Sequence, residues 1–303
     1  MKKPLRLSIW IGPGRNWEDT VCRAKLIEAA GWDGIWVADH LMSVPPARRD
    51  EPQAEALSTL GALCAITDSV TIGSLACPAS TRHPSQLVSM AANCADISGG
   101  RFVLGIGAGW QTTEHDAHGF YLGSRSERSD RLEECAHVVR SLLCNRTTTF
   151  RGRFYVLDQA RSEPTPNPPV PLLIAGKGER RTLRTAARFA NIWNGWVTAE
   201  QLVEKSAILA SHCDALGRDD QEISRSTQVF VVPDRSLIRV EETVSRFGSR
   251  VVLTGPMNKL VEEIADYRHA GLDELIIPDW NFSDTEEFVD IQYRLLDALR
   301  DVA

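Results

Sequence analysis

Short apolar segments and segments of helical periodicity alternate along almost the whole chain. The apolar segments are rich in β-branched residues and have the length of strands, whereas the segments between them repeat apolar residues at the period of an α-helix. Such alternation is typical of a parallel sheet whose strands are joined by helices. The expected strands are 5–10, 34–39, 70–76, 101–107, 170–176, 191–196, 226–232 and 274–280. The expected helices are 17–31, 55–68, 84–100, 128–144, 179–190, 199–217 and 256–271.

The number of strands in this length of 303 residues favours one closed barrel over an open sheet. A doubly wound open sheet of this length would normally divide into two domains, and no linker separates the two halves. Residues 145–169 contain a hairpin-like piece and a proline-rich connection, and then return directly into strand and helix. The sequence therefore predicts a single α/β domain over residues 1–303, a (β/α)8 TIM barrel with an insertion around 145–169.

The 34 basic and 40 acidic residues are spread along the chain and give a net charge of −6. Because no basic block indicates a nucleic-acid or anionic-membrane surface, neither partner is expected. The N-terminal stretch "MKKPLRLSIWIGPG" has too short an apolar run for a secretion signal or a membrane span, so a cytoplasmic protein is predicted. The seven cysteines form no C-x-x-C pair, which favours a reducing compartment and argues against a zinc site.

In barrels of this kind the chemistry lies at the carboxyl ends of the strands. The second expected strand, in "GWDGIWVADH", ends at Asp39 and His40. An imidazole titrates near neutral pH and a neighbouring carboxylate can tune it, so the two residues are candidates for a general acid–base pair. The alternative is structural, with Asp39 capping a turn and His40 hydrogen-bonded and partly buried.

The third expected strand ends in small residues. Gly73 and Ser74, followed by Leu75, suggest a bulge or an unusual backbone that approaches a flat ligand. An ordinary loop explains the same residues.

The fourth expected strand ends in "GIGAGWQTTEHDAHG". A dinucleotide-binding fingerprint fails here, because its third glycine would fall at Trp110. Gly105, Gly107 and Gly109 instead leave a backbone without side chains, as is needed where a planar ring lies directly on it. The polar residues that follow resemble metal ligands, but no second ligand group of matching spacing appears, and a mixed polar loop is favoured over a metal site. These residues are Glu114, His115, Asp116 and His118.

The fifth expected strand is followed by "AGKG", residues 175–178, and then by a helix. Free N–H groups at a glycine-rich helix start bind phosphate well, and Lys177 adds positive charge, so this loop is the best anion-binding candidate in the chain. It lacks the spacing of a Walker loop. Glu179 argues against a phosphate directly on the first helical turn, and a plain barrel turn is the alternative.

Taken together, the strand ends resemble the bacterial-luciferase-like family of flavin- and deazaflavin-dependent oxidoreductases, and most closely its coenzyme F-420-dependent subgroup. The resemblance rests on "GWDGIWVADH", on "DISGGRFVLGIGAGW" and on "ERRTLRTAARFANIWN", and it weakens after about residue 200. It implies an eight-stranded barrel with an isoalloxazine-type ring at its carboxyl mouth. It also implies a non-prolyl cis peptide at Ser74–Leu75.

The resemblance also implies roles for particular residues. Asp39 matches a position that contacts the ring, and His40 matches the active-site imidazole. The cofactor-binding positions implied in addition are Ser74, Leu75, Ala108 and Gly109 at the ring, and Ala175, Gly176, Lys177 and Gly178 at the phosphate-bearing tail. Sugar-phosphate dehydrogenases of the family carry a glutamate where this chain has Trp110, so their acid and substrate do not carry over. Glu114 or His115 could substitute for that acid.

The resulting hypothesis is an F-420-dependent oxidoreductase that transfers hydride between the deazaflavin C5 and a small organic substrate, such as an imine, enone, alcohol or secondary metabolite. His40 would donate or accept the proton, with Asp39 orienting it or the ring, and Glu114 is a further catalytic candidate. An apolar substrate pocket is expected at Trp10, Trp110 and Trp193; Trp36 and Trp196 also lie near strand ends.

Two other functions fit the same residues. The first is an FMN-dependent monooxygenase on the same barrel, which would use reduced FMN and oxygen. The second is a barrel that binds a flavin or another ligand without turnover. By analogy with other luciferase-like barrels a homodimer is expected, and no metal is expected in the site.

Overall fold

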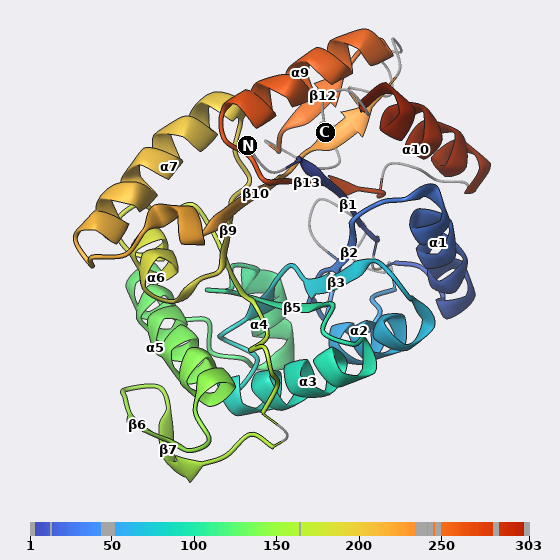
Figure 1. Ribbon diagram of the computed structural model, residues 1–303. Coiled ribbons are helices and arrows are strands. Elements are labelled where there is room, and N and C mark those ends of the chain that lie inside the picture. Colours follow the sequence, from blue (N-terminus) through green and yellow to red (C-terminus); the bar gives the residue numbers. More distant parts are fainter. Residues whose placement is uncertain are drawn as a thin grey trace.

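Eight parallel strands close into a barrel in this computed structural model, which describes residues 4–299 apart from 13, 44–51, 164, 234–240, 242–244, 246–249 and 281–284 (Figure 1). Around the barrel the strands follow the order β3-β2-β1-β13-β10-β9-β8-β5, and pairing of β3 with β5 closes it. The strands are β1 (Arg6–Trp10), β2 (Gly34–Val37), β3 (Thr71–Ser74), β5 (Phe102–Gly107), β8 (Leu172–Ala175), β9 (Ile192–Asn194), β10 (Ser224–Gln228) and β13 (Glu274–Pro278). The predicted α/β barrel is confirmed.

Helices that follow the strands along the chain form an outer ring, the last of them after the final strand (Figure 1). They are α1 (Trp17–Ala30), α2 (Ala56–Ile66), α3 (Pro84–Ile97), α5 (Arg125–Cys144), α6 (Thr182–Phe189), α7 (Ala199–Asp214), α9 (Met257–His269) and α10 (Thr285–Leu299). Their ends follow local chemistry: Gly31 ends α1 in the left-handed conformation, and capping boxes at Ser124 and Thr198 start α5 and α7. The last helix, α10, was not among the expected helices.

The inside of the barrel is a separate apolar core of bulky side chains. It contains Trp10, Trp36, Ala38, Leu75, Val103, Leu173 and Ile276. The indole of Trp36 fills the space where a side chain at Gly73 would lie, so that glycine serves packing inside the barrel rather than approach of a ligand. Below Trp36, the buried carboxyl of Glu274 accepts hydrogen bonds from the Ser8 hydroxyl and the Trp36 indole at 2.5 and 3.1 Å. Burial raises the pKa of Glu274.

The seam between β3 and β5 depends on one serine and one glycine. The Ser74 hydroxyl donates to the carbonyl oxygen of Gly105 at 2.9 Å and accepts from the Gly105 N–H at 2.8 Å. A Cβ atom on Gly105 would overlap the backbone oxygen of Ser74. The two strands therefore approach closely enough to close the barrel only because residue 105 has no side chain.

The insertion is an antiparallel hairpin of β6 (Thr148–Arg151) and β7 (Val156–Ala160), as predicted. Its turn is held by Glu134 of α5, whose carboxylate accepts from the backbone N–H groups of Arg153, Phe154 and Tyr155. Smaller elements complete the fold: β4 (Cys77–Pro78), α4 (Thr112–His118), and the parallel pair β11 (Phe230–Val232) and β12 (Val252–Thr254). Within the described part of the chain, no helix has the length and apolar character to cross a membrane.

Candidate active site

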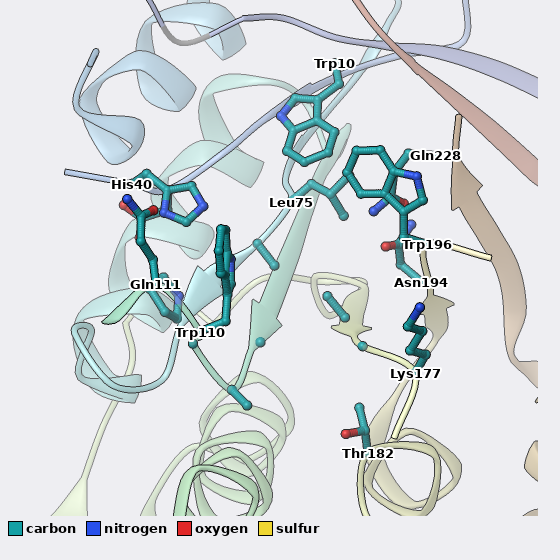
Figure 2. Close-up of a pocket in the computed structure, with 18 of the residues that line it drawn as sticks. Trp10, His40, Leu75, Trp110, Gln111, Lys177, Thr182, Asn194, Trp196 and Gln228 are labelled. Atoms are coloured by element: carbon teal, nitrogen blue, oxygen red, sulfur yellow. The ribbon is translucent and has the colours of Figure 1, made fainter. Parts of the chain in front are cut away.

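A cavity of about 510 Å³ lies at the carboxyl-end mouth of the barrel (Figure 2). Its volume is within the range of roughly 300–1,000 Å³ that is usual for small-molecule sites. Each barrel strand contributes a lining residue at its last position or just beyond it: Trp10, Asp39, Leu75, Gly107, Ala175, Asn194, Gln228 and Trp280. This is the end of the barrel at which chemistry is expected.

His40 and Glu114 form a hydrogen-bonded pair at the edge of this cavity. The Nδ1 atom of His40 lies 3.1 Å from Oε2 of Glu114, and the His40 side chain is 17% exposed. The same carboxylate oxygen accepts from the backbone N–H groups of Leu41 and Met42 at 2.9 and 3.3 Å. Glu114 therefore fixes both the imidazole and the turn that carries it.

The environment of Glu114 keeps it ionised. Burial alone would raise the pKa of this carboxyl, but the hydrogen bond and charge of His40 and the two backbone N–H donors outweigh burial and lower the pKa below its usual 4.5. An ionised carboxylate only accepts hydrogen bonds, so Nδ1 of His40 is the donor and Nε2 remains unprotonated when the ring is neutral. Nε2 has no hydrogen-bond partner among the described residues.

Asp39 lines the cavity but does not pair with His40, contrary to the expected acid–base pair. Its carboxylate accepts two hydrogen bonds from Arg82, at 2.9 and 2.8 Å, and Arg82 also contacts Glu55 at 2.8 Å. These carboxylates raise the pKa of Arg82. The neighbouring carboxylate that contacts the imidazole is Glu114, which comes from a different strand end.

The segment from Glu114 to His118 is not the polar loop that the sequence suggested, because it forms most of the short helix α4, ended by Gly119 in the left-handed conformation. His115 is buried, and both of its ring nitrogens are engaged, Nδ1 with the Gln111 carbonyl at 2.8 Å and Nε2 with the Ser80 hydroxyl at 2.7 Å. Of the two proposed substitutes for the missing acid, only Glu114 contacts the imidazole.

One part of the cavity wall consists of residues with small side chains or none. Ala76, Gly107, Ala108, Gly109 and Ala175 lie at the ends of β3, β5 and β8; we call these residues the ring bed. The non-prolyl cis peptide lies here, at Leu75–Ala76, one residue later than the expected Ser74–Leu75. Ser74 itself does not line the cavity, because its side chain faces β5 at the barrel seam.

The loop after β8 places Gly176 and Lys177 at the cavity, with Thr182 of α6 beside them (Figure 2). Gly176 has a φ of 132°, which only glycine adopts readily. Gly178 does not line the cavity but packs against Thr182. Glu179, which argued against an anion here, is paired with Lys205. Lys177 of this loop and the hydroxyl of Thr182 in α6 are thus the side-chain groups here that can bind an anionic group, whereas the Gly176 N–H already donates to the Asn194 carbonyl.

The tryptophans are distributed differently from the expectation. Trp10 and Trp110 line the cavity, and the half-exposed indole of Trp110 stands edge-on to His40 with ring centroids 5.7 Å apart. Trp193 does not line it: the residue is fully buried on the helix side of β9, and its Nε1 donates to the Gly176 carbonyl at 2.8 Å. Side chains alternate along a strand, so the inward residue is Asn194. The lining residues that the expectation missed include Asn194, Gln228, Arg250 and Trp280.

The fold and this cavity define a parallel barrel enzyme whose site lies at the carboxyl ends of the strands. A family model described as "Luciferase-like monooxygenase" matches residues 3–275. The chain therefore belongs to the luciferase-like family of oxidoreductases, as the resemblance in its sequence indicated.

Individual relatives are similar at modest identity. The chain is 27% identical over 216 residues to an F420-dependent hydroxymycolic acid dehydrogenase of Mycobacterium tuberculosis, an alignment that covers 70% of this chain and 58% of that protein. It is 29% identical over 296 residues to an F420-dependent glucose-6-phosphate dehydrogenase of Microbacterium testaceum, covering 89% and 84%. The chain thus spans less than two thirds of the first relative's length and most of the second's.

Among solved structures, an F420-dependent secondary alcohol dehydrogenase in complex with an F420-acetone adduct has the same fold. The TM-score is 0.86 at 19% sequence identity, and the alignment covers 99% of this chain and 100% of that chain.

Proposed function

We propose that this protein is an oxidoreductase that uses coenzyme F-420 and transfers hydride between the deazaflavin and a small organic substrate. The observation that carries the proposal is the position of His40, whose free Nε2 lies at a cavity that also contains the ring bed. Similarity to F420-dependent dehydrogenases supports the choice of cofactor.

The cavity fits such a cofactor. The ring bed presents backbone and methyl groups over three neighbouring strand ends, so a flat tricyclic ring can lie against it. Lys177 and the hydroxyl-bearing Thr182 line the cavity and are the residues that would bind a phosphate of the tail; the Gly176 N–H already donates to the Asn194 carbonyl at 2.8 Å. When bound, the deazaflavin supplies a carbon, C5, that accepts or donates hydride.

The protein's own contribution is proton handling. With Nδ1 donating to Glu114, the Nε2 atom of His40 accepts the proton of a substrate hydroxyl during oxidation and returns it during reduction. Glu114 positions the imidazole ring through this hydrogen bond. Trp110 covers the exposed edge of the imidazole and limits access of water.

Glu114→Gln is expected to lower stability in a pH-dependent way. A carboxyl whose pKa is lower in the folded than in the unfolded state stabilises the fold above the unfolded value, here about 4.5, and this stabilisation is lost as the pH falls through the folded value. The variant should therefore be less stable than the wild type by about 1–3 kcal/mol at pH 7, and the difference should shrink below pH 4.5.

Urea denaturation at pH 7 and at a pH below 4.5 measures the difference in free energy of unfolding between the variant and the wild type. Asp116→Asn, on the exposed face of the same helix, is the matched control and should match the wild type at both. A Glu114→Gln deficit that is equal at both pH values would show that the ionised carboxylate is not what holds this turn.

The alternative function, an FMN-dependent monooxygenase using oxygen, is supported by the description of the matched family. The ring bed would accept the ring of FMN as well as that of F-420. The two functions are therefore distinguished by the reaction that the protein catalyses, not by the fit of the ring. Under anaerobic conditions, oxidised F-420 should lose its visible absorbance when mixed with the protein and a suitable alcohol. Oxygen-dependent product formation with reduced FMN, and none with F-420 across an alcohol, imine and enone panel, would favour the monooxygenase.

We also propose that the protein is a single-domain homodimer located in the cytoplasm. The family likeness supports the dimer, and the cysteines, free throughout the described residues, are compatible with a reducing compartment. Light scattering of the purified protein measures the oligomeric state.

A further inference from the structure

Two carboxamide side chains, those of Asn194 and Gln228, lie at the mouth of the barrel on the ends of neighbouring strands. Strands β9 and β10 pair in parallel, with Asn194 opposite Ser226. Gln228 is two residues beyond Ser226, so its side chain points to the same face of the sheet, into the barrel. Both residues line the cavity, and in the view of Figure 2 they lie across it from His40. We call Asn194 and Gln228 the amide pair.

The amide pair is buried but incompletely hydrogen-bonded. Asn194 is 1% exposed and Gln228 is 6% exposed. Nδ2 of Asn194 donates to the Ser226 hydroxyl at 2.9 Å, which leaves Oδ1 as the atom that this side chain can offer to a ligand. Oε1 of Gln228 is buried and accepts no hydrogen bond from the described residues, and Nε2 of the same side chain donates to none of them. Buried polar groups are nearly always hydrogen-bonded, so Gln228 lacks a partner that a ligand can supply.

The carboxamide of Gln228 can turn either of its ends toward the cavity. Its last torsion joins an sp3 carbon to an sp2 carbon and has broad minima, and no hydrogen bond to a described residue holds it in one of them. Together with Oδ1 of Asn194, it offers two acceptor oxygens and one NH2 donor. A bound group that satisfies all three must both donate and accept hydrogen bonds.

The charge beside the amide pair argues against an ionic occupant. Arg250 lines the same cavity, and its guanidinium lies over the Trp196 ring at 5.1 Å, where it would repel an ammonium group. A carboxylate would be attracted by Arg250, but it only accepts hydrogen bonds and would face the two amide oxygens. A ketone also only accepts. A neutral carboxamide has two N–H donors and one carbonyl oxygen, which complement the two oxygens and the NH2 group of the amide pair.

From this complementarity we propose that the amide pair anchors the substrate and selects molecules that carry a neutral carboxamide group away from the carbon that exchanges hydride. The N–H groups of that carboxamide donate to Oδ1 of Asn194 and Oε1 of Gln228, and its carbonyl oxygen accepts from Nε2 of Gln228. The inference rests on the proposed function only in treating the bound molecule as a substrate. The anchor forms no covalent bond; it holds one end of the molecule while the other end faces His40.

Calorimetry of the purified protein with benzamide, acetophenone and benzoate tests the anchor without turnover. Benzamide should bind at least about tenfold more tightly than acetophenone, which has no N–H group, and than benzoate, which is charged. Gln228→Met is close in size but cannot donate or accept in the same way, so it should weaken benzamide binding by about tenfold and leave acetophenone binding close to that of the wild type. Gln86→Met, on the exposed face of α3, is the matched control and should change neither.

A second variant keeps the test independent of folding. Gln228→Glu preserves the shape of the side chain and removes its NH2 donor, so it should also weaken benzamide binding by about tenfold. Equal or tighter binding of acetophenone or benzoate, or benzamide binding unchanged in both Gln228 variants, overturns the anchor. Loss of benzamide binding when the protein is saturated with F-420 would assign the amide pair to the cofactor and overturns the anchor as well.

Turnover is measured separately, so that this inference and the proposed function can fail independently. Benzamide binding that depends on Gln228, with hydride transfer to F-420 from a member of the alcohol, imine and enone panel, supports both. The same binding without any hydride transfer supports the anchor and contradicts the proposed function. Hydride transfer with no preference for benzamide supports the proposed function and overturns the anchor.

Discussion

Replacing His40 with alanine is expected to slow hydride transfer by about 100-fold or more while leaving cofactor binding close to that of the wild type. The imidazole has its Nε2 free at the cavity and its Nδ1 fixed by Glu114, so under the proposed mechanism its loss removes the group that takes the substrate proton. The ring bed and the loop after β8 come from other strands and stay intact. Single-turnover kinetics with F-420 measures the effect, and fluorescence titration measures binding.

A matched histidine elsewhere gives the control. His118→Ala removes an exposed imidazole from the last turn of α4 and should leave both rate and affinity unchanged. If His40→Ala turns over at the wild-type rate, His40 has no part in the mechanism. If it loses cofactor affinity instead of rate, the residue belongs to the cofactor site rather than to proton transfer.

Gly105→Ala is expected to destabilise the fold by at least about 3 kcal/mol, the upper part of the range for overpacked cores. The added methyl group would overlap the backbone oxygen of Ser74 and separate β3 from β5, where the barrel closes. The backbone of Ser74 cannot rotate away as a flexible side chain can, so the overlap can be relieved only by moving the two strands apart. Chemical denaturation measures the free energy of unfolding.

Gly61→Ala is the opposite case. This glycine lies inside α2, and nothing within 4 Å would meet its new methyl group. Alanine there should stabilise the protein by about 0.5–1 kcal/mol, since glycine is a poor helix former. Equal effects of the two substitutions would contradict the account of the β3–β5 seam.

Periodicity was enough to predict the barrel, because each strand is buried on both faces and each helix has one apolar stripe. Helix α10, which lies beyond the last expected strand and was not among the expected helices, carries the same signal: Phe288, Ile291, Leu295 and Leu299 are buried along one face. Whether a single side chain faces into the barrel or out toward the helices is harder to predict from the sequence. Trp193 and Trp196 are three positions apart, and only the end of β9 at Asn194 decides that the first faces helices and the second faces the cavity.

Contacts between residues that are distant in the sequence are the second feature that the sequence alone does not predict. Asp39 stands next to His40 in the chain, which made it the obvious partner, but its carboxylate faces Arg82. Glu114, 74 positions away, reaches the imidazole because β2 and the helix after β5 meet across the mouth. The glycines likewise divide by environment: Gly105 closes the barrel, whereas Gly107 and Gly109 line the cavity.

Titration of the purified protein with F-420 and with FMN tests the central claim most directly, namely that the ring bed and the loop after β8 hold a deazaflavin beside His40. Fluorescence or absorbance should report micromolar binding of F-420, weakened when Gly107 is replaced by leucine and the ring bed is filled. Micromolar binding of FMN with indifference to F-420 would contradict the account.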